Sequence, residues 1–147
     1  MYLSRATQYI FLLLRISMGW LLIYEGYTKL NSNTWSILPS ISGSHILPDM
    51  YNLLATQPIL GILNQWYPVI IIVTGSMILT GLWMRIGATV ASLLLIFTYL
   101  PQLSFPFVGV NYYIVSPNII YILVITALAW MNADQFWGLG ADVRINK

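Results

Sequence analysis

The stretch YIFLLLRISMGWLLIYEGYTKL, residues 9–30, decides the fold because it is long and apolar enough to cross a lipid bilayer as a helix. Arg15, Glu25 and Lys29 lie in one sector of this helix about 120° wide, at about 100° per residue. Gly19 and Gly26 lie on the same face, where they would let a neighbouring helix approach closely. Charge at membrane depth costs at least about 2.5 kcal/mol per side chain, so we expect this face to turn inward.

The three charged residues of this face are the candidate catalytic residues of the chain. Glu25 and Lys29 are spaced i,i+4 and can form an ion pair directly. Arg15 lies about 15 Å from Glu25 along the helix axis. It therefore needs a partner on another helix, such as Asp134 or Asp142, unless it extends to the nearer membrane surface.

The composition of the whole chain agrees with a lipid environment. Of its 147 residues, 59% are hydrophobic and 7% are charged, and the mean hydropathy is +0.77. These values exclude a soluble monomer and a disordered chain, and a net charge of +2 is too small for a nucleic-acid partner. The chain has no cysteine and one histidine, so we expect no disulfide, no metal site and no covalently bound cofactor.

Three further apolar runs follow the first. We predict an all-α membrane protein with one domain, residues 1–147, built as a bundle of four transmembrane helices. A long outer loop separates the first two helices, and its last part, 51–65, is a candidate interfacial helix. Met84-Arg85 forms the turn between the second and third helices. A signal peptide is the alternative for the first run, but the run is too long and contains Arg15. The predicted spans are about 9–30, 66–83, 86–103 and 117–132.

The distribution of basic residues predicts the orientation of the bundle in the cell membrane. With four spans, the two termini and Arg85 lie on the same side, which then holds four basic residues against Lys29 alone on the other. Both termini are therefore expected in the cytoplasm, in a multi-pass arrangement. The four basic residues are Arg5, Arg85, Arg144 and Lys147.

Each of the other three helices also carries one face of small and polar residues. Four such faces are best buried by turning them inward, which predicts a polar interior. The simpler interpretation is that the Ser, Thr and Asn side chains only hold the helices together. The faces are Thr74, Gly81 and Arg85 on the second helix, with Gly75 to one side; Ala88, Ala91, Ser92, Leu95, Tyr99 and Gln102 on the third; and Asn118, Tyr121, Ile125, Ala129 and Asn132 on the fourth.

Several of these motifs together resemble the DoxX/DoxD family of four-helix membrane proteins. The first helix, LLLRISMGWLLIYEGYTKL, is similar to that of the family, as are Gly75, Gly81 and the turn with Arg85 followed by Gly87-Ala88. The ending AWMNADQFWGLGADV, residues 129–143, resembles the family's closing segment. The long outer loop is typical of the DoxD branch. One departure is Ile71, at a position where many members carry a carboxylate, so Glu25 would have to take over any proton handling.

The DoxD resemblance implies a function in sulfur metabolism and the respiratory chain. DoxD is the large membrane subunit of thiosulfate:quinone oxidoreductase, which oxidises thiosulfate to tetrathionate, reduces quinone and pairs with a DoxA subunit. On this basis Lys29 would attract thiosulfate, and a DoxA-like subunit or a larger membrane complex would be the partner. The alternatives are a non-catalytic accessory or assembly subunit and a small transporter. Candidates to line a quinone site are Tyr24, Tyr27, Tyr99 and Tyr121.

Overall fold

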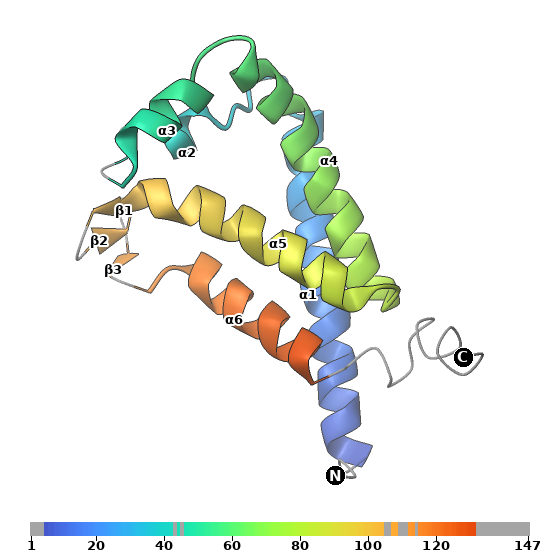
Figure 1. The fold of residues 1–147 in the computed structure, drawn as a ribbon. Coiled ribbons are helices and arrows are strands. Elements are labelled where there is room, and N and C mark those ends of the chain that lie inside the picture. Colours follow the sequence, from blue (N-terminus) through green and yellow to red (C-terminus); the bar gives the residue numbers. More distant parts are fainter. Residues whose placement is uncertain are drawn as a thin grey trace.

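The computed structural model describes residues 5–42, 44, 46–104, 107–108, 112–113 and 115–131, and at 112–113 it describes the backbone alone. Helix α1 packs along α4, and α5 packs along α6 (Figure 1). The elements are α1 (Arg5–Asn31), α2 (Leu38–Ile41), α3 (Pro48–Leu54), α4 (Ile59–Thr80), α5 (Met84–Tyr99), the 3-10 turn η1 (Leu100–Gln102), β1 (Leu103–Ser104), β2 (Phe107–Val108), β3 (Tyr112–Tyr113) and α6 (Pro117–Trp130).

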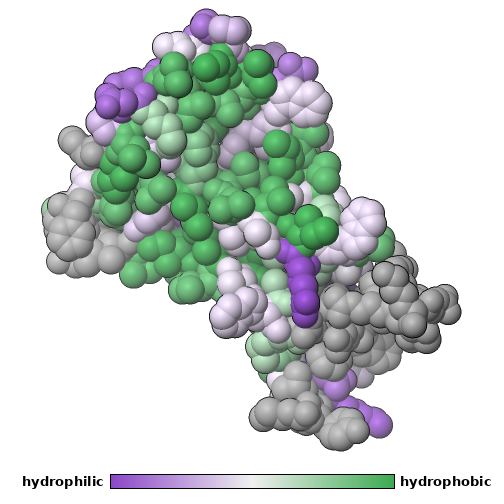
Figure 2. All heavy atoms as spheres, viewed as in Figure 1, coloured by the Kyte–Doolittle hydropathy of each residue, from purple (hydrophilic) through white to green (hydrophobic). Residues whose placement is uncertain are grey.

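Three helices in the described part of the chain are long and apolar enough to cross a membrane. They are α1, α4 and the continuous segment Met84–Gln102, which joins α5 to η1. Helix α6 is apolar but has only 14 residues, fewer than the roughly 20 that a span needs, so the four-span count stays a prediction. Figure 2 shows apolar side chains across the middle of one face, with hydrophilic ones gathered mainly at the top.

Helices α1 and α4 touch through glycines. A Cβ added to Gly19 would lie 2.7 Å from Leu79 Cβ, and one added to Gly75 would lie 2.9 Å from the Gly19 carbonyl oxygen. A Cβ on Gly26 would lie 2.6 Å from Ile72 Cγ1. Only a residue without a side chain fits at these three positions, which we call the glycine seam. The seam confirms that the glycine face of α1 turns inward.

The second predicted span begins earlier and ends earlier in the structure. Helix α4 starts at Ile59 rather than Trp66, and it continues through Pro68. Proline is tolerated in membrane helices because neighbouring groups satisfy the freed carbonyl. The turn to α5 is formed by Gly81–Trp83, with φ of 75° at Gly81 and 48° at Trp83. The predicted turn at Met84-Arg85 is therefore wrong, because both residues lie in the first turn of α5.

The predicted outer loop is partly helical and covers one end of the bundle. We call the segment Trp35–Ile37 together with α2 and α3 the cap. Ile37, Ile41 and Tyr51 of the cap are each only 1% exposed. The Tyr51 hydroxyl donates a hydrogen bond to the Phe97 carbonyl oxygen at 3.0 Å, and burial raises the pKa of the Tyr51 phenol. The cap is thus packed onto α5 rather than extended into solvent.

The segment between α5 and α6, predicted as loop, contains a small antiparallel sheet. Its strand order is β1-β2-β3. Leu103 pairs with Val108 in the first ladder, and Phe107 pairs with Tyr113 in the second. Each strand has only two residues, which is too short to produce a recognisable pattern in the sequence, so a search for apolar runs does not find them. Residues named above that lie outside the described part of the chain are Asn132, Asp134, Asp142, Arg144 and Lys147.

The orientation of the bundle can be tested by thiol labelling, since the chain has no native cysteine. We expect single cysteines at positions 3 and 146 to react with an impermeant reagent only after the cells are opened. A Thr56→Cys variant, exposed between α3 and α4, should react in intact cells. Labelling of position 3 or 146 in intact cells would overturn the predicted cytoplasmic termini.

Candidate functional site

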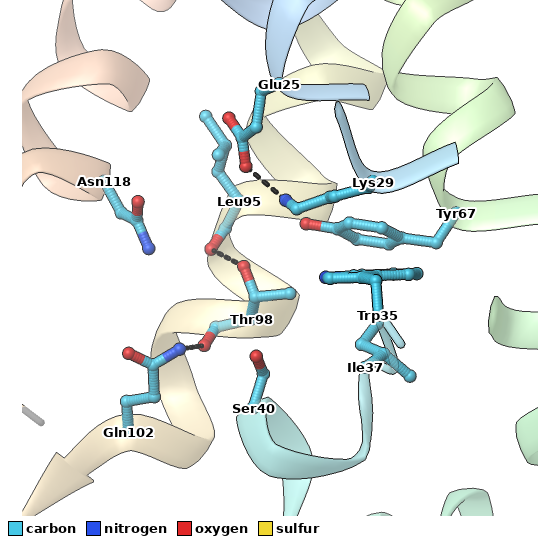
Figure 3. A pocket seen from close by; sticks show the side chains of 10 residues that line it. All are labelled: Glu25, Lys29, Trp35, Ile37, Ser40, Tyr67, Leu95, Thr98, Gln102 and Asn118. Atoms are coloured by element: carbon cyan, nitrogen blue, oxygen red, sulfur yellow. Dashed lines mark hydrogen bonds and ion pairs between the residues drawn. The ribbon is translucent and has the colours of Figure 1, made fainter. Parts of the chain in front are cut away.

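A small polar pocket lies beneath the cap, where α1, α4, α5 and α6 come together (Figure 3). Its volume is about 110 Å³, compared with about 30 Å³ for one water molecule in the liquid. The pocket therefore accommodates a few waters or one small polyatomic ion. Its lining residues are Glu25, Lys29, Trp35, Ile37, Ser40, Tyr67, Leu95, Thr98, Gln102 and Asn118.

A charged pair and an aromatic pair meet in this pocket. Lys29 Nζ forms an ion pair with Glu25 Oε1, which confirms the predicted i,i+4 pairing. The same ammonium lies 5.1 Å from the centre of the Tyr67 ring and 5.7 Å from that of Trp35. The two rings stack with their centres 5.8 Å apart and their planes inclined by 20°. Both distances from the ammonium are within the roughly 6 Å at which a ring face attracts a cation.

Trp35 reaches the pocket because a side chain of α4 holds the cap in place. Asn64 Oδ1 accepts a hydrogen bond from the Ile37 backbone N–H at 2.8 Å. Its amide nitrogen also donates to Ser36 Oγ at 3.2 Å. These bonds attach Ser36 and Ile37 to the first half of α4. Tyr67 lies one turn further along the same helix and is only 4% exposed.

The α5 side of the pocket is polar but internally hydrogen-bonded. The Thr98 hydroxyl donates to the Leu94 and Leu95 carbonyls at 3.3 and 3.2 Å. Gln102 Nε2 donates to the Thr98 carbonyl at 2.9 Å. The Asn118 side-chain amide points toward the space in Figure 3, whereas the Gln102 side-chain oxygen points away from Thr98 and Lys29. The arrangement can thus receive an anion at Lys29, with the neutral Asn118 amide as a donor opposite.

The structure brings together only two of the residues singled out in the sequence as site candidates. Glu25 and Lys29 share the pocket. Arg15 is 3% exposed, but it lies further along α1 and does not line the pocket. Tyr24 and Tyr27 are 61% and 58% exposed on the outside of α1. Tyr99 and Tyr121 are partly buried and also lie outside the lining.

Sequence reasoning missed the aromatic walls of the site and the residue that positions one of them. Trp35 stands in a stretch without helical periodicity, and Tyr67 lies in the predicted span 66–83 without a polar or charged neighbour that would single it out. Asn64 was read as part of an interfacial segment. The one available signal was that Lys29 stands at the end of the first predicted span and Tyr67 at the start of the second, which places both at the same membrane level.

The described part of the chain contains no group of three or more His, Cys, Asp and Glu side chains placed to hold a metal ion.

A prediction at Arg15 distinguishes a need for the guanidinium group itself from a need for a positive charge alone. Its side chain is buried and takes part in an interaction within the chain. A planar guanidinium makes bonds that an ammonium cannot reproduce, so Arg15→Lys should destabilise the protein nearly as much as Arg15→Ala, by about 3 kcal/mol. The midpoint of thermal unfolding in detergent measures this, with exposed Arg5→Lys on the same helix as control. If the Arg15→Lys protein unfolds at the same temperature as the wild type, the planar guanidinium is not required at this position.

Long apolar helices enclosing a charged pair define an integral membrane protein. The chain belongs to the DoxX family, whose sequence profile matches residues 10–103. This family comprises membrane proteins with a loose link to quinone oxidoreductases. The match covers α1 from residue 10 onward, the cap, α4 and α5 with η1, and therefore most of the pocket, but it ends before α6. No curated protein and no solved structure shows significant similarity to the chain.

Proposed function

We propose that the chain is the membrane subunit of a quinone-linked oxidoreductase of the DoxD type, and that its pocket receives thiosulfate. The observation that carries the proposal is the Lys29 ammonium, held against two aromatic rings inside a pocket of about 110 Å³. Thiosulfate, an ion of five non-hydrogen atoms, is of the right size for this pocket. Membership of the DoxX family supports the link to quinone.

Glu25 gives this site a second function in the proposed reaction. Two thiosulfate ions joined to tetrathionate release two electrons, and quinone takes up these electrons together with two protons. An anion that binds Lys29 competes with the Glu25 carboxylate for the ammonium. The displaced carboxylate then becomes a proton acceptor at the pocket. In this proposal proton handling falls to Glu25 on α1, because the second transmembrane helix carries Ile71 where many family members have a carboxylate.

The quinone itself needs a different location from thiosulfate. Pockets for drug-sized ligands measure roughly 300–1,000 Å³, well above the volume beneath the cap. Tyr99 and Tyr121, both partly buried, and Tyr24 and Tyr27, which face outward, stay candidates to contact a quinone head that arrives from the lipid. A DoxA-like subunit is the proposed partner.

The test is thiosulfate-dependent reduction of a quinone analogue by membranes with and without the chain. We expect Lys29→Gln to lower kcat/KM for thiosulfate at least about tenfold, the loss that about 1.4 kcal/mol represents. Arg5→Gln removes a charge from the exposed start of the same helix and should leave the rate unchanged. Equal rates with and without the chain would refute the proposal.

A non-catalytic accessory subunit is the second candidate, and one observation favours it. The polar groups of the pocket largely satisfy one another: Lys29 pairs with Glu25, and Thr98 and Gln102 bond to the backbone of their own helix. Polar groups that only hold helices together must likewise find their partners within the protein. Loss of a co-purifying respiratory complex on deletion of the chain, without thiosulfate-dependent quinone reduction, would identify this role.

A further inference from the structure

Three hydrogen-bond donors in the lining of the pocket beneath the cap have no partner within the described part of the chain. They are the Trp35 indole N–H, the Ser40 hydroxyl and the Asn118 side-chain amide. The charged pair of α1 and the polar side chains of α5 are, in contrast, bonded to one another or to the backbone. Because polar groups inside a protein are normally hydrogen-bonded, the three donors are available to whatever enters the pocket.

The three donors reach the pocket from separate segments of the chain. Trp35 precedes α2 in the cap, Ser40 lies within α2, and Asn118 lies in the first turn of α6. In Figure 3 the indole nitrogen, the Ser40 oxygen and the Asn118 amide point toward the space between them. A ligand in this space therefore meets donors on several sides, and it must present several acceptor atoms to satisfy them.

All three donors are uncharged, so they can bind an anion without an unpaired cation. A hydrogen bond to an ionised acceptor is roughly twice as strong as one between neutral groups. Three such bonds can hold an oxyanion whether Lys29 stays paired with Glu25 or not. The volume of about 110 Å³ limits this ion to a few non-hydrogen atoms. The donors and the volume together favour a small anion with several oxygens on one central atom.

We infer that the pocket recognises the –SO₃⁻ group of its ligand, and that Trp35, Ser40 and Asn118 determine this specificity by offering one donor to each oxygen. The inference rests on the function proposed above, because thiosulfate carries such a group, and it specifies which end of the ion is held. The terminal sulfur, which must form the new S–S bond, is not bound by these donors. Asn118 lies outside residues 10–103, so the family profile does not include this donor.

The experiment is isothermal titration calorimetry of the purified protein in detergent with thiosulfate, methanesulfonate and thiocyanate. Methanesulfonate has the –SO₃⁻ group without the terminal sulfur, and thiocyanate has a terminal sulfur without oxygens. We expect thiosulfate and methanesulfonate to bind, and thiocyanate to bind at least about tenfold more weakly. Trp35→Phe, Ser40→Ala and Asn118→Leu each remove one donor and should each weaken thiosulfate binding about tenfold, the loss of one hydrogen bond to a charged group.

Trp66→Phe is the matched control for the tryptophan variant. Trp66 is 56% exposed on α4 and does not line the pocket, so this variant should bind thiosulfate as the wild type does. Trp35→Phe keeps an aromatic ring beside Tyr67 and removes the indole N–H. Unchanged thermal unfolding of the three donor variants verifies that a loss of binding is not a loss of fold.

Three outcomes would overturn the inference: thiocyanate that binds as tightly as methanesulfonate, full thiosulfate affinity in the three donor variants, or no binding of either –SO₃⁻ ligand to the wild type at millimolar concentration. Quinone reduction is measured separately, so the two proposals can fail independently. Thiosulfate that binds with the expected variant effects but reduces no quinone would refute the proposed function and support the recognition of the –SO₃⁻ group.

Discussion

Gly19→Ala and Gly75→Ala are each expected to lower the free energy of unfolding by about 1–3 kcal/mol, the usual cost of overpacking. The added Cβ at Gly19 would come within 2.8 Å of the Leu79 backbone nitrogen, and that at Gly75 within 3.0 Å of the Ile23 backbone nitrogen. Backbone atoms cannot rotate away, so the two helices must separate. The effect is large because the α1–α4 contact loses its close packing along its whole length.

Gly61→Ala is the matched control on the same α4 helix. There an added Cβ would meet only the end of the Gln57 side chain, at 3.5 Å, which is ordinary contact. We expect no loss of stability, since alanine favours a helix over glycine by roughly 0.5–1 kcal/mol. The double variant at Gly19 and Gly75 should cost less than the sum of the single changes, because one separation of the helices relieves both clashes. Equal stability of the Gly61, Gly19 and Gly75 variants would contradict the glycine seam.

Removing either member of the Glu25–Lys29 pair should destabilise the protein more than removing both. Lys29→Met leaves the Glu25 carboxylate without a cation among the described residues of the pocket. Glu25→Gln leaves an ammonium that still lies against two ring faces. We therefore expect Lys29→Met to be the worse of the two single changes. Because the pair is partly exposed, the coupling should be about 1–2 kcal/mol, below the 3–5 kcal/mol of a fully buried pair.

A double-mutant cycle on thermal unfolding in detergent measures this coupling. Raising the salt concentration should reduce it less than it would for a fully exposed pair, because the two side chains are partly buried. Additive losses would show that the two charges act independently. If Glu25→Gln proved worse than Lys29→Met, the ring faces would not be supporting the cation.

The inward face of α1 could be predicted from sequence because helical geometry alone determines it. Arg15, Gly19, Leu22 and Gly26 repeat at three- and four-residue intervals, and all four are buried. The Glu25–Lys29 pair follows from the same local rule. Such predictions need no knowledge of the other helices, which is why they are confirmed.

The walls of the pocket depend on contacts between segments that are distant in the sequence. The spacing of residues within one helix therefore cannot predict them. Trp35 meets Tyr67 only because Asn64 attaches the cap to α4, across a separation of 27 residues from Ile37. The start of α4 was missed because Pro58 and the polar residues after it interrupt the apolar run. The exposed positions of Tyr24 and Tyr27 became clear only once the packing partner of α1 was known.

The order in which the ribosome makes these helices gives the spacing of Glu25 and Lys29 a further consequence. Helix α1 is complete at Asn31, but the surface that covers its glycine face ends at Thr80. At about 5–20 residues per second, synthesis of the intervening chain takes roughly 2–10 s. During that delay the Glu25 carboxylate already has its countercharge, supplied by the same helix. Helix α1 can therefore enter the membrane with these two charges neutralised before α4 has been synthesised.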